Sequence, residues 1–164
     1  MKSVVFIRHA KSSWKNPELI DLDRPLNQRG KRDLQNVGYL FKNEGIKPDL
    51  IICSNAVRAK TTAKSLAAQC GYQKEIVVNE NLYFKGSSTI FRQINQLSES
   101  FEKIWIVFHN PDINEIAIDL LQANEDNIPT LGCVFTKSIS PTWINWSINN
   151  TEIVRIVKPK NLLS

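Results

Sequence analysis

Short apolar runs alternate with amphipathic stretches along this chain, and that alternation restricts the fold more than any other feature of the sequence. The run Ile104–Phe108 is apolar at every position, and Val4–Ile7 is nearly as uniform, which is typical of strands buried on both faces. The runs that predict strands are Val4–Ile7, Leu50–Cys53, Ile76–Val78, Ile104–Phe108, Cys133–Ser138 and Glu152–Lys158.

The stretches between these runs carry apolar residues at helical spacing and have good capping residues at their ends. Asparagine and serine favour helix N-termini, proline suits the first turn, and glycine favours the left-handed C-terminal cap. The expected helices are 27–43, capped by Asn27; 56–70, ended by Gly71; one capped by Ser87 or Ser88; and one opened by Asn110-Pro111.

Strands that alternate with helices predict an α/β fold, a three-layer sandwich with helices flanking a mainly parallel central sheet. The 164 residues fit a single domain that spans 1–164. No apolar run approaches the roughly 18–20 residues of a membrane span. The first run stops at Arg8 after four residues, too short for the core of a signal peptide. We therefore expect a cytoplasmic protein that does not enter a membrane.

The metal-binding residue types are few and scattered. Three cysteines, Cys53, Cys70 and Cys133, are widely spaced, and the chain contains only two histidines. This pattern lacks the paired spacing of zinc sites and of small disulfide frameworks. The sequence therefore predicts no metal and no cofactor.

Both histidines come where a predicted strand ends. His9 is separated from the first strand by one arginine, and His109 directly follows the strand Ile104–Phe108. Ligands of open parallel sheets bind outside the carboxyl ends of the strands. A single histidine in such a turn is more often a structural residue with a hydrogen-bond partner. Two at the same edge, with arginines nearby, favour a functional site.

Three arginines are expected near that edge. Arg8 precedes His9, Arg58 begins the helix after the strand Leu50–Cys53, and Arg24 lies in the long loop after the first strand. A guanidinium group binds phosphate oxygens in a bidentate manner and stays charged at any relevant pH. A neutral imidazole can attack phosphorus directly, and nearby positive charge keeps it unprotonated. The combination favours phosphoryl transfer without a metal.

Four segments resemble the histidine phosphatase superfamily, whose fold is phosphoglycerate mutase-like. They are RHAKSSW (8–14), DRPLNQRG (23–30), SNAVRAKTTA (54–63) and HNP (109–111). Within the superfamily the chain looks most like the small SixA-type phosphohistidine phosphatases, which act in signal transduction. The resemblance covers most of the chain, in the right order and spacing.

The resemblance implies a role for each matched residue. His9 would carry the phosphoryl group, and Arg8 and Arg58 would bind its oxygens. His109 would donate to the same group from the other side. Arg24 would complete or close the substrate pocket.

Ser12 and Asn110 are further candidates for substrate binding. The backbone N–H groups around Ser12 could line an anion pocket, whereas Asn110 has a sufficient role as a helix cap. Possible proton donors are Glu80 and Asp23, with Asp21 a third carboxylate nearby. None stands out. A phosphohistidine leaving group can be protonated on its other ring nitrogen, so a weak supply of acids fits P–N cleavage better than P–O cleavage.

The sequence thus predicts a phosphatase that forms a phosphohistidine intermediate on His9 and dephosphorylates phosphohistidine on a protein such as a phosphotransfer domain. The alternative is a broad phosphomonoesterase acting on a small phosphate ester. A non-catalytic phosphate- or nucleic-acid-binding module would account for the formal charge of +5. Because no nucleic-acid motif is present, we expect no nucleic-acid partner.

Overall fold

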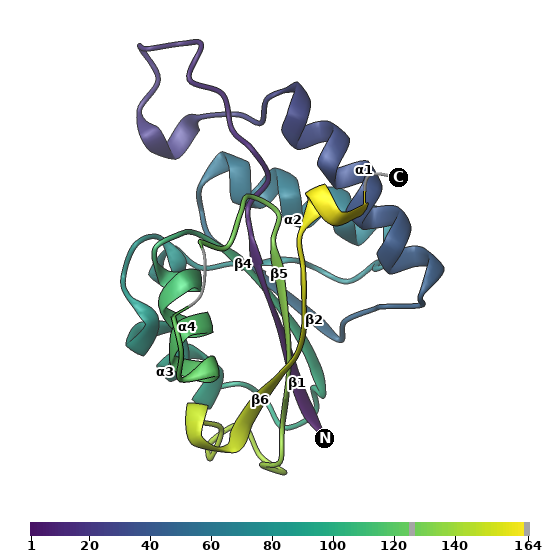
Figure 1. Ribbon diagram of the computed structural model, residues 1–164, viewed down its shortest axis with the longest axis vertical. Helices are drawn as coiled ribbons and strands as arrows, with labels where there is room; N and C mark the ends of the chain where they lie inside the picture. The colour runs from purple at the N-terminus through teal and green to yellow at the C-terminus, as the bar shows by residue number, and fades with distance from the viewer. Residues whose placement is uncertain (125–126, 163–164) are drawn as a thin grey trace.

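The computed structural model describes residues 1–124 and 127–162. A six-stranded sheet in the order β3-β2-β4-β1-β5-β6 forms the middle layer, and helices cover both of its faces (Figure 1). This is the predicted α/β sandwich. Within the described residues, no helix is long and apolar enough to cross a membrane.

The strands match the apolar runs closely. They are β1 (Lys2–Arg8), β2 (Leu50–Cys53), β3 (Val77–Val78), β4 (Lys103–Phe108), β5 (Cys133–Ser138) and β6 (Thr151–Val157). The α-helices are α1 (Gln28–Asn43), α2 (Val57–Cys70), α3 (Ser87–Asn95) and α4 (Asp112–Leu121). Short 3₁₀ turns include η1 (Asp21–Asp23) and η2 (Glu80–Leu82).

The middle of the sheet determines where the functional groups meet. Strand β1 pairs with β4 in parallel, and Arg8 lies opposite Phe108 in the register. Strand β2 pairs in parallel with the other side of β4, and β3 extends this parallel set. Strand β5 runs antiparallel to β1, and β6 runs antiparallel to β5, so the sheet is mixed. The carboxyl ends of β1, β4 and β2 are therefore adjacent.

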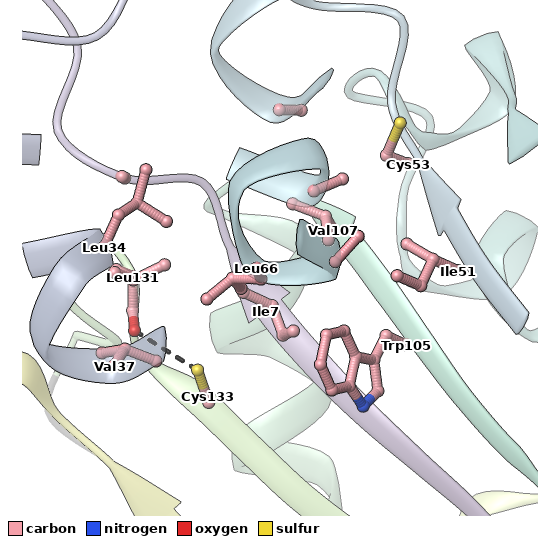
Figure 2. Packing of buried hydrophobic residues seen from close by; sticks show 14 of the residues in the cluster. Ile7, Leu34, Val37, Ile51, Cys53, Leu66, Trp105, Val107, Leu131 and Cys133 are labelled. Atoms are coloured by element: carbon pink, nitrogen blue, oxygen red, sulfur yellow. Dashed lines mark hydrogen bonds between the residues drawn. The ribbon is translucent and has the colours of Figure 1, made fainter. Parts of the chain in front are cut away.

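Each face of the sheet has its own apolar core. Helices α1 and α2 pack on the face that carries Ile7, Trp105 and Val107 (Figure 2). Helices α3 and α4 cover the opposite face, where Phe6 and Phe108 lie. Neighbouring residues of β1 and β4 thus point into opposite cores, as strands buried on both faces require.

Two helices start differently from the sequence prediction. Helix α3 begins at Ser87, but its N-cap is Gly86, whose φ of 88° lies in the left-handed region, and not Ser87 or Ser88. Helix α4 begins at Asp112 with Pro111 as its N-cap. The N–H of Ile113 already donates to the carbonyl of His109, so the turn at His109 leads into the helix before α4 is regular.

The long segment between β1 and α1 lies over the carboxyl edge of the sheet (Figure 1). Ser12 forms an isolated antiparallel bridge with Leu26, which holds the two ends of this segment together. A Cβ atom on Gly30 would lie 2.2 Å from the carbonyl oxygen of Lys11, so only glycine permits this approach of α1. The segment is therefore anchored where it leaves and re-enters the fold.

Candidate active site

His9 and His109 are adjacent at the carboxyl edge of the sheet. They directly follow the neighbouring strands β1 and β4, and their ring centroids are 5.1 Å apart. Both side chains are buried, with 7% of His9 exposed and none of His109. The prediction that the two histidines meet at one edge is confirmed.

The hydrogen bonds of His9 determine which ring nitrogen is free to react. Nδ1 is 2.7 Å from the carbonyl oxygen of Ala10, which can only accept, so Nδ1 carries the proton. Nε2 then keeps its lone pair and accepts from Nε of Arg58 at 3.3 Å. Burial lowers the pKa of His9 to about 3; the bond to Ala10 opposes this shift, and nearby guanidinium groups add to it. At neutral pH the ring is therefore uncharged, and the lone pair of Nε2 faces the guanidinium group of Arg58.

Thr62 fixes the backbone around His9. Its hydroxyl accepts from the N–H of Ala10 at 3.0 Å and donates to the carbonyl of Arg58 at 2.8 Å. The turn after β1 is thereby tied to the first turn of α2. This contact gives the threonine in the segment after Arg58 a physical role.

His109 is held by Ser54, the first residue of the segment SNAVRAKTTA, which had no role of its own in the sequence prediction. Nε2 of His109 is 2.8 Å from Oγ of Ser54, which also accepts from the N–H of Ala56 at 3.2 Å. A buried hydroxyl with one acceptor role already filled is best satisfied by donating its hydrogen, here to Nε2. The proton of His109 then resides on Nδ1, which is buried and has no hydrogen-bond partner among the described residues. Burial, followed by repulsion between the protonated forms of the two histidines, lowers the pKa of His109 to about 2.

Arg8 also presents a free donor. One terminal nitrogen donates to the carbonyl of Ile128 at 2.7 Å, whereas Nε is buried with no partner in the part of the chain that the structure describes. Buried polar atoms in proteins are nearly always paired, so unpaired ones need an explanation. Nε of Arg8, the residue before His9, and Nδ1 of His109, whose ring lies beside that of His9, are thus unpaired donors. Such donors suit an anion.

Asp21 connects both remaining arginines. Arg58 donates to its backbone oxygen at 2.7 Å and to Oδ2 at 2.9 Å, and Arg24 donates to Oδ1 at 2.8 Å. The hydroxyl of Tyr83 donates to Oδ2 at 2.5 Å. Partial burial alone would raise the pKa of Asp21, but these hydrogen bonds outweigh it and hold that pKa below its ordinary value. Asp21 is therefore an ionised anchor for the arginines.

Arg24 lies in the loop above the site and has all three guanidinium nitrogens on protein acceptors. These are Asp21, the hydroxyl of Ser12 and, at 3.1 Å, the carbonyl of Ser13. The exposed ring of Trp14 stacks on the guanidinium group, 3.3 Å from its carbon to the ring centroid. Arg24 and Ser12, two predicted substrate-binding residues, thus contact each other and hold the loop closed.

The remaining predicted site residues lie at the margin or outside. Asn110 donates through Nδ2 to Asn127 at 2.9 Å, and its Oδ1 is buried without a partner. Glu80 lies in η2 and is exposed, and Asp23 is exposed in η1. The carboxylate that pairs with Arg24 is Asp21 and not its sequence neighbour Asp23. Tyr83 and Ser54 are the contributors that sequence reasoning missed; only their positions just after a strand or turn hinted at them.

Comparisons with known proteins agree with this geometry. A model of the histidine phosphatase superfamily (branch 1) matches residues 4–83. An uncharacterised protein of Mycobacterium tuberculosis is 31% identical over 114 residues, 70% of this chain and 69% of the relative. An uncharacterised chloroplastic protein of Arabidopsis thaliana is 33% identical over 116 residues, 70% of this chain, which spans about half, 51%, of that relative. The chain belongs to the histidine phosphatase superfamily.

Solved structures show the same fold at low sequence identity. The protein histidine phosphatase SixA in complex with tungstate superposes with a TM-score of 0.84 at 15% identity, covering 98% of this chain and 99% of SixA. A phosphoserine phosphatase from Entamoeba histolytica superposes with a TM-score of 0.66 at 15% identity, covering 99% and 100% of the two chains. The overall fold is thus the phosphoglycerate mutase-like fold of the SixA neighbours.

Proposed function

We propose that this chain is a metal-independent phosphatase that carries the phosphoryl group on Nε2 of His9. The observation that carries the proposal is the hydrogen bonding of His9, from which its tautomer follows. Its bond to the carbonyl of Ala10 leaves Nε2 unprotonated, beside an arginine and two residues with unpaired donors. A neutral nucleophile next to fixed positive groups is what attack on a phosphate dianion requires.

The hydrogen-bond donors around Nε2 of His9 have different roles in binding a phosphoryl group. Nε of Arg58 points at His9, while its terminal nitrogens are occupied by Asp21. Nε of Arg8 and Nδ1 of His109 complete a set of donors for the phosphoryl oxygens. These oxygens share the negative charge of the transition state, so donors already in place lower the barrier without reorganisation. Arg24 acts indirectly in this scheme, by holding the loop and Asp21.

The reaction has two displacements. In the first, the bond from Nε2 of His9 to phosphorus forms while the bond from phosphorus to the leaving group breaks, and the leaving group keeps the electron pair. In the second, water attacks phosphorus, the Nε2–phosphorus bond breaks, and inorganic phosphate leaves with His9 restored. Both displacements are in line, so the leaving group and the water occupy the side opposite His9.

The proposed substrate is phosphohistidine on a protein such as a phosphotransfer domain. Support comes from the carboxylates: Asp21 is held ionised by its arginine and tyrosine partners, and Glu80 is exposed. An alkoxide leaving group needs a proton donor, whereas an imidazole can take a proton on its other nitrogen and depart neutral. The fold similarity to SixA, a protein histidine phosphatase that binds tungstate, supports the same choice.

A small phosphate ester is the second candidate, favoured by the similar fold of the phosphoserine phosphatase. The test compares turnover of a phosphohistidine-bearing phosphotransfer domain with turnover of phosphoserine. We expect the domain to be the better substrate by kcat/KM. Faster turnover of phosphoserine would overturn the protein-substrate proposal but not the nucleophile.

The nucleophile is tested separately by trapping the intermediate. Brief exposure to ³²P-labelled phosphotransfer domain should give a labelled enzyme whose label is lost in acid and kept in alkali. The His9→Ala variant should take up no label, whereas Glu80→Ala, changed at an exposed position, should label like the parent. Labelling of His9→Ala at the parental level would refute the assignment of His9.

A further inference from the structure

Phe84 has an unusual backbone conformation for an aromatic residue. Its φ of 55° lies in the left-handed region that favours glycine. Bulky residues rarely adopt this conformation, and those that do cluster at active sites and ligand clamps. Gly86, two positions later, also has a positive φ, 88°, but a glycine adopts it without steric cost. The conformation therefore indicates that the ring itself is needed at this place.

The strained backbone directs the ring of Phe84 onto the candidate active site. Its centroid is 4.8 Å from that of His109 at an interplanar angle of 32°, and 4.6 Å from that of Tyr83. His109 in turn is 5.1 Å from His9. Phe84 thus contacts His109, whose ring lies next to that of the proposed nucleophile His9. Yet 47% of its surface is exposed, so the contact with His109 leaves much of the ring open.

The other groups around the nucleophile are charged or polar. Arg8 and His109 carry the unpaired donors for the phosphoryl oxygens, and Arg58, anchored by Asp21, adds positive charge beside His9. They suit the phosphate half of a substrate and offer nothing to an apolar leaving group. Phe84 provides an apolar surface at the margin of this site.

We propose that Phe84 is a specificity-determining residue that stacks against a planar aromatic leaving group. The imidazole of phosphohistidine is such a group, and so is the ring of an aryl phosphate; the side chain of phosphoserine is not. This inference rests on the proposed function, because it requires a phosphoryl group held by the donors of Arg8 and His109 beside His9. Stacked aromatic pairs gain about 2- to 10-fold in binding beyond the burial of their area.

The test uses two inert ligands of similar size, phenylphosphonate and cyclohexylphosphonate, at an alkaline pH at which both are dianions. Dissociation constants are measured by calorimetry, so no turnover is needed. The parent protein should bind phenylphosphonate about 3- to 10-fold more tightly than cyclohexylphosphonate, because only the first ring can stack. Equal affinities in the parent protein would overturn the proposal before any variant is made.

Variants then test whether Phe84 is the source of the preference for phenylphosphonate. Phe84→Leu keeps an apolar cover on His109 but removes the aromatic ring, and should bring the two affinities to within about 2-fold. Phe84→Tyr should restore the preference. Tyr39→Leu, at an exposed aromatic residue on α1, is the matched control and should behave like the parent. Melting temperatures measured without ligand confirm that each variant is folded.

Two failures are distinguishable. If the parent and Phe84→Leu share the same aromatic preference, the role of Phe84 is wrong and the phosphate site stands. If neither phosphonate binds the parent at millimolar concentration, the phosphate site itself is wrong and the inference falls with it.

Discussion

The two histidines predict how the stability of the protein depends on pH. They are the only histidines in the sequence, and both are buried in neutral form. Burial lowers the pKa of His9 to about 3 and that of His109 to about 2. In the unfolded chain both should titrate near 6.5. Between these values the unfolded state binds more protons than the folded state, so acidification favours unfolding.

The sign and size follow from linkage. A histidine whose folded pKa is depressed leaves stability intact above pH 6.5 and removes it progressively as the pH falls towards the folded pKa. At pH 5 each histidine costs about 2 kcal/mol of unfolding free energy, and the pair costs about 4 kcal/mol. That is a large part of the 5–15 kcal/mol typical of a domain. Asp21, whose pKa is also lowered, contributes stability that is lost only below about pH 4, which is more acidic than pH 5.

The assay is urea unfolding at pH 8 and pH 5, with the parent protein, His9→Gln and His109→Gln. The parent should lose about 4 kcal/mol between the two pH values, and each variant about 2 kcal/mol, because glutamine does not titrate. The readout is the difference in unfolding free energy between pH 8 and pH 5. A variant that is less stable at both pH values therefore still gives a usable result. A parent that loses less than about 1 kcal/mol would refute the neutral, buried state of these rings.

Three substitutions test the surroundings of the histidines. Asp21→Asn removes the charge that orients Arg58 and should lower kcat/KM about 10- to 100-fold, measured with a phosphohistidine domain; an effect below 2-fold would argue against this anchor. Ser54→Ala leaves Nε2 of His109 unpaired and should cost about 1–3 kcal/mol in urea unfolding as well as slow the enzyme's labelling; unchanged values would contradict the assigned tautomer. Glu80→Gln should leave kcat within about 2-fold, because the residue is exposed, and a loss of the 10²–10⁴-fold typical of a general acid would instead favour a monoesterase.

Much of the fold could be predicted because most of its strands coincide with continuous apolar runs in the sequence. β2 has the predicted bounds, and β4 differs by one residue, since continuous apolar runs leave no other way to be buried. The predicted N-cap of α3 was wrong because two requirements compete at this helix start. Ser87 has the better capping side chain, but Gly86 reaches the left-handed conformation that the preceding turn imposes. Such a requirement comes from tertiary structure and has no mark in local composition.

The candidate site, like the fold, has residues that the sequence could place and residues that it could not. Residues attached to strand ends, His9 and His109, could be placed together because parallel strands end at one edge. Asp21 and Tyr83 could not, since their contact joins two loops distant in the sequence. Loop spacing does not determine where a carboxylate points. The pairing of Arg24 with Asp21 rather than Asp23 shows that even adjacent candidates are decided by the turn η1.

The environment of Asp21 bears most directly on the choice of substrate. A general acid must hold a proton at the working pH, and the hydrogen bonds that Asp21 accepts favour its ionised form instead. The same bonds make it a good anchor for Arg58, so the two roles exclude each other at this carboxylate. A substrate whose leaving group needs an external proton would therefore gain nothing from Asp21. An imidazole leaving group is protonated on its other ring nitrogen and needs no acid from the protein. The ionised state of Asp21 is therefore no obstacle to P–N cleavage, whereas it is one to P–O cleavage.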